Sequence, residues 1–136
     1  MKTYIMKTTL LLFTLFSFVG MSTGQATLPD LIGKWKLQKV ETHHGVILPK
    51  QKDFFLTISK TLITYNLDVN SCGTDSFLID NKNITLDESR TACTKVCCDG
   101  MFDTISNYLH YSGAFELHDS LLIITNDKAK IYLIKE

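Results

Sequence analysis

Apolar and polar residues alternate along much of the chain from Gly33 onward, with the period of a β-strand that buries one face. In the first such stretch, Gly33–Glu41, the apolar residues Trp35, Leu37 and Val40 interleave with charged residues. The alternation slips once, near Gln38. This stretch predicts a half-buried strand.

Further short runs are rich in β-branched and aromatic residues, which favour strands. These runs are residues 54–58, 62–65, 77–79, 84–86, 114–117, 121–125 and 131–134. Polar turns rich in Asp, Asn and Ser separate several of them, so neighbouring runs are expected to pair as antiparallel hairpins. Residues 46–49 form another short extended piece, and we expect it at an edge because Pro49 has no N–H to donate.

One stretch breaks the two-residue rhythm. Between Asp99 and Tyr111 the apolar residues recur at the spacing of a helix, and they are Met101, Phe102, Ile105, Tyr108 and Leu109. Asp99 is placed to cap the start of this helix, and Gly113 stands just beyond its end. The sequence therefore predicts an amphipathic helix of about three turns, inserted before the last strands of a small antiparallel β domain.

The start of the chain has the order of a secretory signal peptide. A start with two lysines leads into the apolar run Leu10–Val19, and the small residues Ser22-Thr23-Gly24 follow. The apolar run is shorter than the ~20 residues that span a bilayer. We expect residues 1–24 to be removed on export, with either Met1 or Met6 as the true start.

Export determines the compartment in which the rest of the chain is expected. The first cysteine is Cys72, so no cysteine at the cleavage site is available for lipid attachment. We therefore expect residues 25–136 to be periplasmic or secreted, in an oxidising space.

Composition narrows the class of protein further. The whole chain has 136 residues, with 14 Lys and Arg against 14 Asp and Glu. This balance excludes binding to nucleic acid driven by net charge, and no second apolar run is long enough for a transmembrane anchor. The length after residue 24 suits a single domain, residues 25–136.

The order of several short motifs resembles the META/HslJ domain family, and more distantly the lipocalins. In chain order the motifs are Gly33-x-Trp35, Asn70-Ser71-Cys72-Gly73, the hairpin Phe77-x-Ile79-Asp80-Asn81-x-x-Ile84, Thr91-Ala92-Cys93 ahead of a helix, and the terminal hairpin with Leu121 and Ile123. The likeness covers Leu31 to Lys135.

The resemblance implies a mainly β (α+β) fold, a small antiparallel open or cracked β barrel with one helix packed on it. Family members of this kind are bacterial envelope domains without an established catalytic activity. The resemblance thus implies a non-catalytic role in envelope stress tolerance through surface interactions, with an envelope protein as one kind of partner. The lipocalin likeness implies the alternative, binding or carriage of a small apolar ligand.

The four cysteines, Cys72, Cys93, Cys97 and Cys98, form an even set in an exported chain and therefore predict disulfides. We favour the pair Cys72–Cys93, because a bond between the neighbours Cys97 and Cys98 strains the peptide between them. Pairing of Cys72 with Cys97 or Cys98 stays open, and so does pairing of the two neighbours. No Cys-x-x-Cys knuckle is present, so no metal site is expected.

The motifs of the common catalytic sites are missing from the sequence. It contains no Gly-x-Ser-x-Gly elbow and no glycine-rich phosphate loop. Asp87-Glu88 lies in a polar stretch and is interpreted as a solvated loop. We expect no catalytic residues and no cofactor.

The aromatic residues have two interpretations. In a small barrel they most simply fill the core, and in a lipocalin-like protein some of them line a ligand cavity. The candidates for either role are Trp35, Phe55, Tyr65, Phe77, Phe115 and Tyr132.

Overall fold

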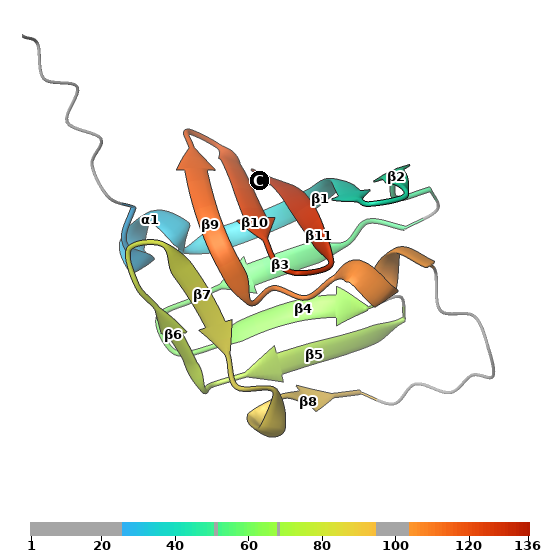
Figure 1. Cartoon of the computed structure of the whole chain (residues 1–136). Helices are drawn as coiled ribbons and strands as arrows, with labels where there is room; N and C mark the ends of the chain where they lie inside the picture. Colours follow the sequence, from blue (N-terminus) through green and yellow to red (C-terminus); the bar gives the residue numbers. More distant parts are fainter. Residues whose placement is uncertain (1–25, 51, 68, 95–103) are drawn as a thin grey trace, which may run out of the picture.

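The computed structural model describes residues 26–50, 52–67, 69–94 and 104–136. These residues form a mainly antiparallel β structure in which one sheet curls into an open barrel (Figure 1). The fold class expected from the sequence is thus confirmed. No helix within the described ranges is long and apolar enough to cross a membrane. The expected signal peptide lies outside them.

The elements follow one another with short connections. The strands are β1 (Gly33–Thr42), β2 (Gly45–Ile47), β3 (Phe55–Ile58), β4 (Ile63–Leu67), β5 (Asn70–Thr74), β6 (Phe77–Ile79), β7 (Asn83–Leu86), β8 (Ala92–Cys93), β9 (Gly113–His118), β10 (Leu121–Thr125) and β11 (Ala129–Lys135). The helical elements are α1 (Leu28–Leu31) and the 3₁₀ turns η1 (Glu88–Arg90) and η2 (Thr104–Tyr108).

The strands pair in the order β6-β7-β9-β10-β11-β1-β3-β4-β5-β8, and β2 pairs with β1 beside this path. In Figure 1, β9, β10 and β11 lie on one side of the barrel, and β3, β4, β5 and β8 lie on the other. Backbone and side-chain bonds between Ser76 and Asp87 continue the β6–β7 pairing past Phe77 and Leu86. The amide of Asp87 donates to the Ser76 carbonyl at 3.0 Å, and the Ser76 hydroxyl donates to Asp87 at 3.3 Å.

The long strand β1 lies at the centre of the sheet and carries much of the core. Trp35, Leu37 and Val40 are buried, and the register against β11 shifts between Leu37 and Lys39. This bulge coincides with the slip in the sequence alternation at Gln38. Because strand side chains alternate between faces, the extra residue keeps Val40 on the buried face.

Several short elements, among them α1, β5 and β8, were not expected from the sequence. The helix α1 begins after Thr27, whose amide and hydroxyl both donate to the carboxylate of Asp30, at 2.7 and 2.8 Å. These two bonds to Asp30 offset the low intrinsic stability of so short a helix. Strands β5 and β8 contain Asn, Ser, Gly and Cys rather than the aliphatic residues typical of strands. Pairing with neighbouring strands decides their conformation.

The amphipathic helix predicted over residues 99–111 is wrong for the part that the structure describes. Residues 104–108 form the 3₁₀ turn η2, and the chain leaves the helical path after Tyr108. The amide of His110 donates to the carbonyl of Tyr108 at 2.9 Å, a bond too local to continue a helix. Residues 99–103 lie outside the described residues.

The apolar spacing in this stretch predicted burial correctly but not conformation. Ile105 and Leu109 are both buried, although only a short turn separates them. Gly113 does not cap a helix. It opens β9 with a φ of +157°, and a Cβ at this position would collide with the carbonyl of Thr125 on β10. The chain is extended from this point on, where Gly113 pairs with Ile84 of β7 and Ala114 pairs with Thr125 of β10.

Candidate ligand pocket

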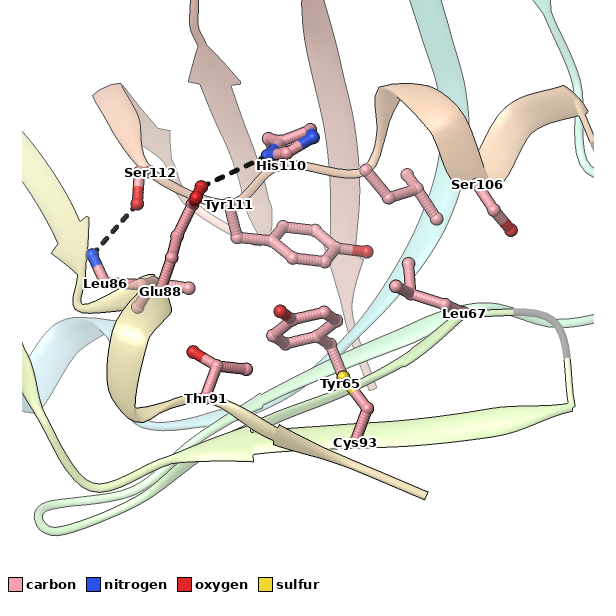
Figure 2. Close-up of a pocket in the computed structure, with 11 residues that line it drawn as sticks. Tyr65, Leu67, Leu86, Glu88, Thr91, Cys93, Ser106, His110, Tyr111 and Ser112 are labelled. Atoms are coloured by element: carbon pink, nitrogen blue, oxygen red, sulfur yellow. Dashed lines mark hydrogen bonds and ion pairs between the residues drawn. The ribbon is translucent and has the colours of Figure 1, made fainter. Parts of the chain in front are cut away.

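A cavity of about 240 Å³ lies in the opening of the barrel. One wall comes from β4 and β8, and the other comes from η2 and the segment between η2 and β9 (Figure 2). The strands do not pair across this gap, so side chains rather than backbone hydrogen bonds occupy its edges. The opening of the barrel thus provides the concave site in which small-molecule ligands usually bind.

The deep part of the pocket is largely apolar. Leu86, Ser106, Leu109 and Tyr111 line it, and each of them is buried. The Tyr111 ring is only 2% exposed and projects into the space above Tyr65 in Figure 2. A ligand that reaches this depth would lose most of its contact with water.

Among the described residues, two buried hydroxyl groups beside the pocket have no hydrogen-bond partner, those of Ser106 and Tyr111. Neither has surface that a water molecule in the pocket could reach, and in Figure 2 the Ser106 hydroxyl points away from Tyr65 and Tyr111. A buried polar group without a partner costs about 1–3 kcal/mol. Burial, together with the neighbouring Tyr65, raises the pKa of Tyr111, which keeps its hydroxyl protonated at physiological pH.

The rim of the pocket is polar and solvated. Across it, the His110 Nδ1 atom lies 3.5 Å from the Glu88 carboxylate. Thr91 and Cys93 complete this side. Burial, and secondarily the charge of Glu88, raises the pKa of the Tyr65 hydroxyl. Polarity thus decreases from the rim to the deep wall.

Short-range bonds hold Glu88 at the rim. The Asp87 carboxylate caps η1 by accepting the amide of Ser89 at 3.1 Å, and the Ser89 hydroxyl donates to the same carboxylate at 2.6 Å. On the opposite wall the hydroxyl of Ser112 accepts the amide of Leu86 at 2.9 Å. This bond ties the segment before β9 to the end of β7.

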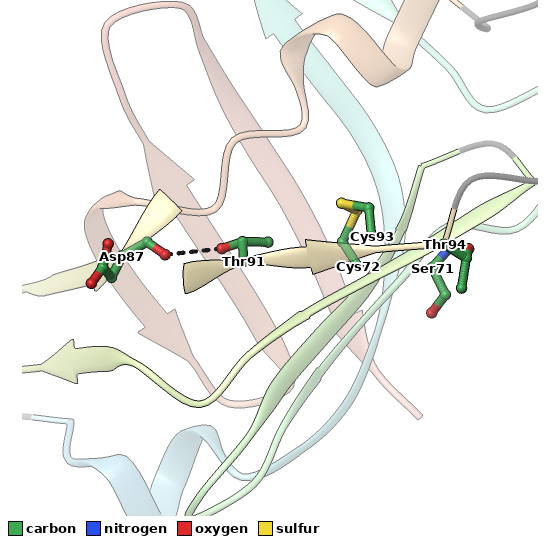
Figure 3. The surroundings of a disulfide bond; sticks show 6 residues. All are labelled: Ser71, Cys72, Asp87, Thr91, Cys93 and Thr94. Atoms are coloured by element: carbon green, nitrogen blue, oxygen red, sulfur yellow. Dashed lines mark hydrogen bonds between the residues drawn. A yellow bond between two sulfur atoms is a disulfide. The ribbon is translucent and has the colours of Figure 1, made fainter. Parts of the chain in front are cut away.

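A disulfide between Cys72 and Cys93 anchors the wall formed by β8 (Figure 3). The two residues face each other in the β5–β8 pairing, with Cα atoms 4.0 Å apart. Two bonds extend the pairing at one end, because the Thr94 amide donates to the Ser71 carbonyl and the Ser71 amide donates to the Thr94 hydroxyl. The Cys72–Cys93 pair favoured from the sequence is confirmed, whereas Cys97 and Cys98 lie outside the described residues.

The aromatic candidates from the sequence fall into three groups. Trp35 and Phe115 are buried in the core, and Phe77 packs against it. Tyr65 is the candidate that lines the pocket.

The other two candidates, Phe55 and Tyr132, lie outside both the core and the pocket. Each carries a lysine ammonium over its ring, Lys34 at 3.8 Å and Lys39 at 4.2 Å. Alternation places them there, because their strand neighbours point inward.

The pocket also contains residues that sequence reasoning missed. Tyr111, Ser106 and Leu109 were assigned to a helix stripe or not singled out, and Glu88 was interpreted as part of a solvated loop. A signal for two of them was present, since Leu109 and Tyr111 flank His110 with the two-residue alternation of an extended segment. The gap that they line exists only in the tertiary structure, so no local sequence pattern predicts it.

Among the described residues, no group of three or more His, Cys, Asp or Glu side chains is close enough to hold a metal ion. No protein-family model matches the chain, and no match was found among curated proteins or solved structures.

Proposed function

We propose that this chain is an exported, non-catalytic domain that binds a small ligand in the opening of its barrel. The observation that carries the proposal is the 240 Å³ cavity in the opening of the barrel, whose lining includes the buried side chains of Leu86, Leu109 and Tyr111. A concave, mostly apolar site with a few polar groups at its rim is the form that small-molecule pockets usually take. Of the two roles that the sequence suggests, ligand binding is the one that this geometry favours.

Location outside the cytoplasm is part of the same proposal. The Cys72–Cys93 disulfide is typical of proteins in oxidising compartments. Together with the signal-like start of the sequence, it supports a periplasmic or secreted protein. The proposal includes a META/HslJ-like relationship, supported by the order of the motifs and by the open antiparallel barrel.

The arrangement around His110 supports binding rather than catalysis. Its Nδ1 atom faces Glu88, and its Nε2 atom lies 3.2 Å from the ammonium of Lys128. A nucleophile activated by histidine needs a hydroxyl or thiol within hydrogen-bond reach of a ring nitrogen. Here each ring nitrogen of His110 faces a charged side chain, Glu88 or Lys128, instead of a hydroxyl or thiol.

Native mass spectrometry of the protein, purified from the envelope fraction or medium of its source organism, tests the proposal. We expect a bound species of low mass that is released on denaturation. The variant Leu67→Trp fills the pocket with a large side chain and should abolish this species. The matched variant Leu78→Trp, at an exposed position of β6, should retain it. A bare polypeptide that also binds no member of a fragment library would contradict the proposal.

A second candidate function is a surface interaction with an envelope protein. The strand β6 ends the pairing path of the sheet, and its residue Leu78 is 64% exposed. An edge strand with an exposed apolar side chain can accept an additional strand from a partner. Cross-linking from position 78 in the living cell, followed by identification of the adduct, distinguishes this function from ligand binding.

A further inference from the structure

We infer that the free edge of β6 pairs with β6 of a second copy of this chain, in antiparallel register about a two-fold axis at Leu78. This inference rests on the second candidate function, a surface interaction at β6, and names the partner strand. It is independent of the ligand pocket, whose lining includes no residue of β6. Unbonded backbone groups, exposed apolar side chains and the order of residues along the edge carry it.

The backbone of β6 leaves four hydrogen-bonding groups at the edge of the sheet. In an antiparallel pair, residues whose backbone groups face the partner strand alternate with residues whose groups face away. Bonds donated by the amides of Asp80 and Asp87 set this alternation along the β6–β7 hairpin. Phe77 and Ile79 therefore direct one N–H and one C=O group each away from β7. Among the described residues, these four groups have no hydrogen-bond partner.

The side chains of β6 do little to protect this edge. Native edge strands are commonly blunted by lysine, proline or a bulge, which discourage pairing with another chain. β6 is Phe77-Leu78-Ile79, its register against β7 is regular, and it lies at the margin of the molecule in Figure 1. Leu78 is 64% exposed, more than any other large apolar side chain among the described residues. Pairing with another strand is thus open, and the short length of β6 keeps it weak.

A second copy of β6 satisfies all of the unbonded groups. In an antiparallel pair centred on Leu78, Phe77 of each copy lies opposite Ile79 of the other. Each of these residue pairs exchanges N–H···O=C bonds in both directions. The contact is isologous, so it closes on itself and yields a dimer rather than an open chain of subunits.

Apolar side chains meet on both faces of this pair. Leu78 lies opposite Leu78 of the other copy at a non-hydrogen-bonded position, where side chains of antiparallel strands are closest. On the inner face, Phe77 and Ile79 are half-buried against the core, and each gains the other from the second copy as a neighbour. Pairing therefore removes the exposed apolar surface of Leu78 from water.

The charges beside β6 are compatible with this pairing. Asp75 falls opposite Asn81 of the second copy, and Asp80 falls opposite Ser76. Like charges directly opposite each other would destabilise the pair, and this register brings none together. The match between the strand and its own reverse is the observation that favours a second copy over an unrelated partner.

Charge substitution at position 78 tests whether two copies meet there. We expect the wild-type mature protein to form a weak, reversible dimer whose population rises with concentration in sedimentation velocity. Leu78→Lys and Leu78→Glu should each weaken it about tenfold, because an apolar contact is replaced by like charges. An equimolar mixture of the two variants should regain dimerisation. Native mass spectrometry identifies the mixed dimer when one variant carries a heavy-nitrogen label.

A matched pair of variants controls for the added charge. Val46→Lys and Val46→Glu alter an apolar side chain of β2 that is 58% exposed, and both should dimerise like the wild type. The amide spectrum of each variant shows whether it is folded.

Hydrogen exchange tests the backbone pairing itself. In the monomer the amides of Phe77 and Ile79 have no acceptor, whereas the amide of Leu78 faces Thr85 of β7. Raising the protein concentration should slow exchange at Phe77 and Ile79 and leave Leu78 nearly unchanged. Association through the Leu78 side chain alone would not protect these two amides, and that result would contradict the strand pairing.

The outcomes separate this inference from the proposed functions. A wild type that stays monomeric into the millimolar range would overturn the inference, and so would a dimer that Leu78→Lys retains or charged variants that do not associate when mixed. If the wild type is monomeric but position 78 cross-links to a different envelope protein, the inference is wrong and the second candidate function stands. If neither self-association nor a cross-link is found, both fail together, and ligand binding in the pocket is unaffected.

Discussion

The rings of Tyr65 and Tyr111 meet edge to face across the opening of the barrel, with centroids 5.1 Å apart and planes inclined by 61°. Tyr65 belongs to β4, and Tyr111 belongs to the segment between η2 and β9. The contact therefore links two parts of the molecule that no backbone pairing joins at this point. It closes the core on one side and forms the floor of the pocket on the other.

The ring and the hydroxyl of Tyr111 should contribute to stability with opposite signs. Tyr111→Phe removes an unpartnered buried hydroxyl and should raise the free energy of unfolding of the ligand-free protein by up to ~1 kcal/mol. Tyr111→Ala also removes the ring and should lower it by ~3–5 kcal/mol. Urea unfolding of the two variants and the wild type measures both changes. A loss of more than ~1 kcal/mol in Tyr111→Phe would show that the hydroxyl has a partner.

The disulfide should matter both to global stability and to the wall of the pocket. It joins residues 21 positions apart, so the double variant Cys72→Ala/Cys93→Ala should lose ~3 kcal/mol of unfolding free energy in the chain-entropy model. Hydrogen exchange should increase most at β8, because without the disulfide two residue pairs and two bonds at Thr94 connect it to β5. Peptide mapping of the oxidised wild type provides the control. A Cys72 peptide linked to Cys97 or Cys98 would overturn the assignment.

Two glycines with positive φ allow a matched test of close packing. Gly113 and Gly45 have φ values of +157° and +128°, but only a Cβ at Gly113 would meet other atoms, those of Thr125 and Asn126. Gly45→Ala should cost ~1–3 kcal/mol from backbone strain alone. Gly113→Ala should cost more, or prevent folding, because the β9–β10 pair must separate. Equal losses in thermal unfolding would contradict the structure at the start of β9.

Asp80 should make stability depend on pH in the acid range. Its carboxylate accepts the amides of Lys82 and Asn83, each at 2.8 Å, and these bonds hold its pKa below the usual value. The unfolded chain therefore binds a proton at a higher pH than the folded chain does. The stabilisation is complete above the unfolded pKa, near 3.9, and is lost as the pH falls through the lower folded pKa.

The variant Asp80→Asn should therefore flatten the decline in unfolding free energy between about pH 5 and pH 2. Asp127→Asn, at an exposed turn, serves as the control and should follow the wild-type profile more closely. Denaturant unfolding at a series of pH values gives the slopes. Parallel profiles for wild type and Asp80→Asn would contradict the role of the two amide bonds.

The fold was accessible from the sequence because local patterning and global packing agree. Strand β10 was predicted with its observed bounds, Leu121–Thr125, and β1 was predicted to within one residue. In both strands the alternation of apolar and polar residues matches the pleat, so period and burial agree. Strand β5 escaped notice because its residues are held by pairing and by the disulfide rather than by their own preference.

The sequence by itself determined the mainly antiparallel class and most of the strands, and it favoured the pair of cysteines that bridges β5 and β8. These properties are local in origin or follow from simple pairing. Only the tertiary structure decided that the stretch before β9 ends its turn at Tyr108, and that Tyr111 lies against Tyr65 over a cavity. Helical and extended segments can bury the same apolar residues, and the choice depends on pairing partners that are distant in the sequence.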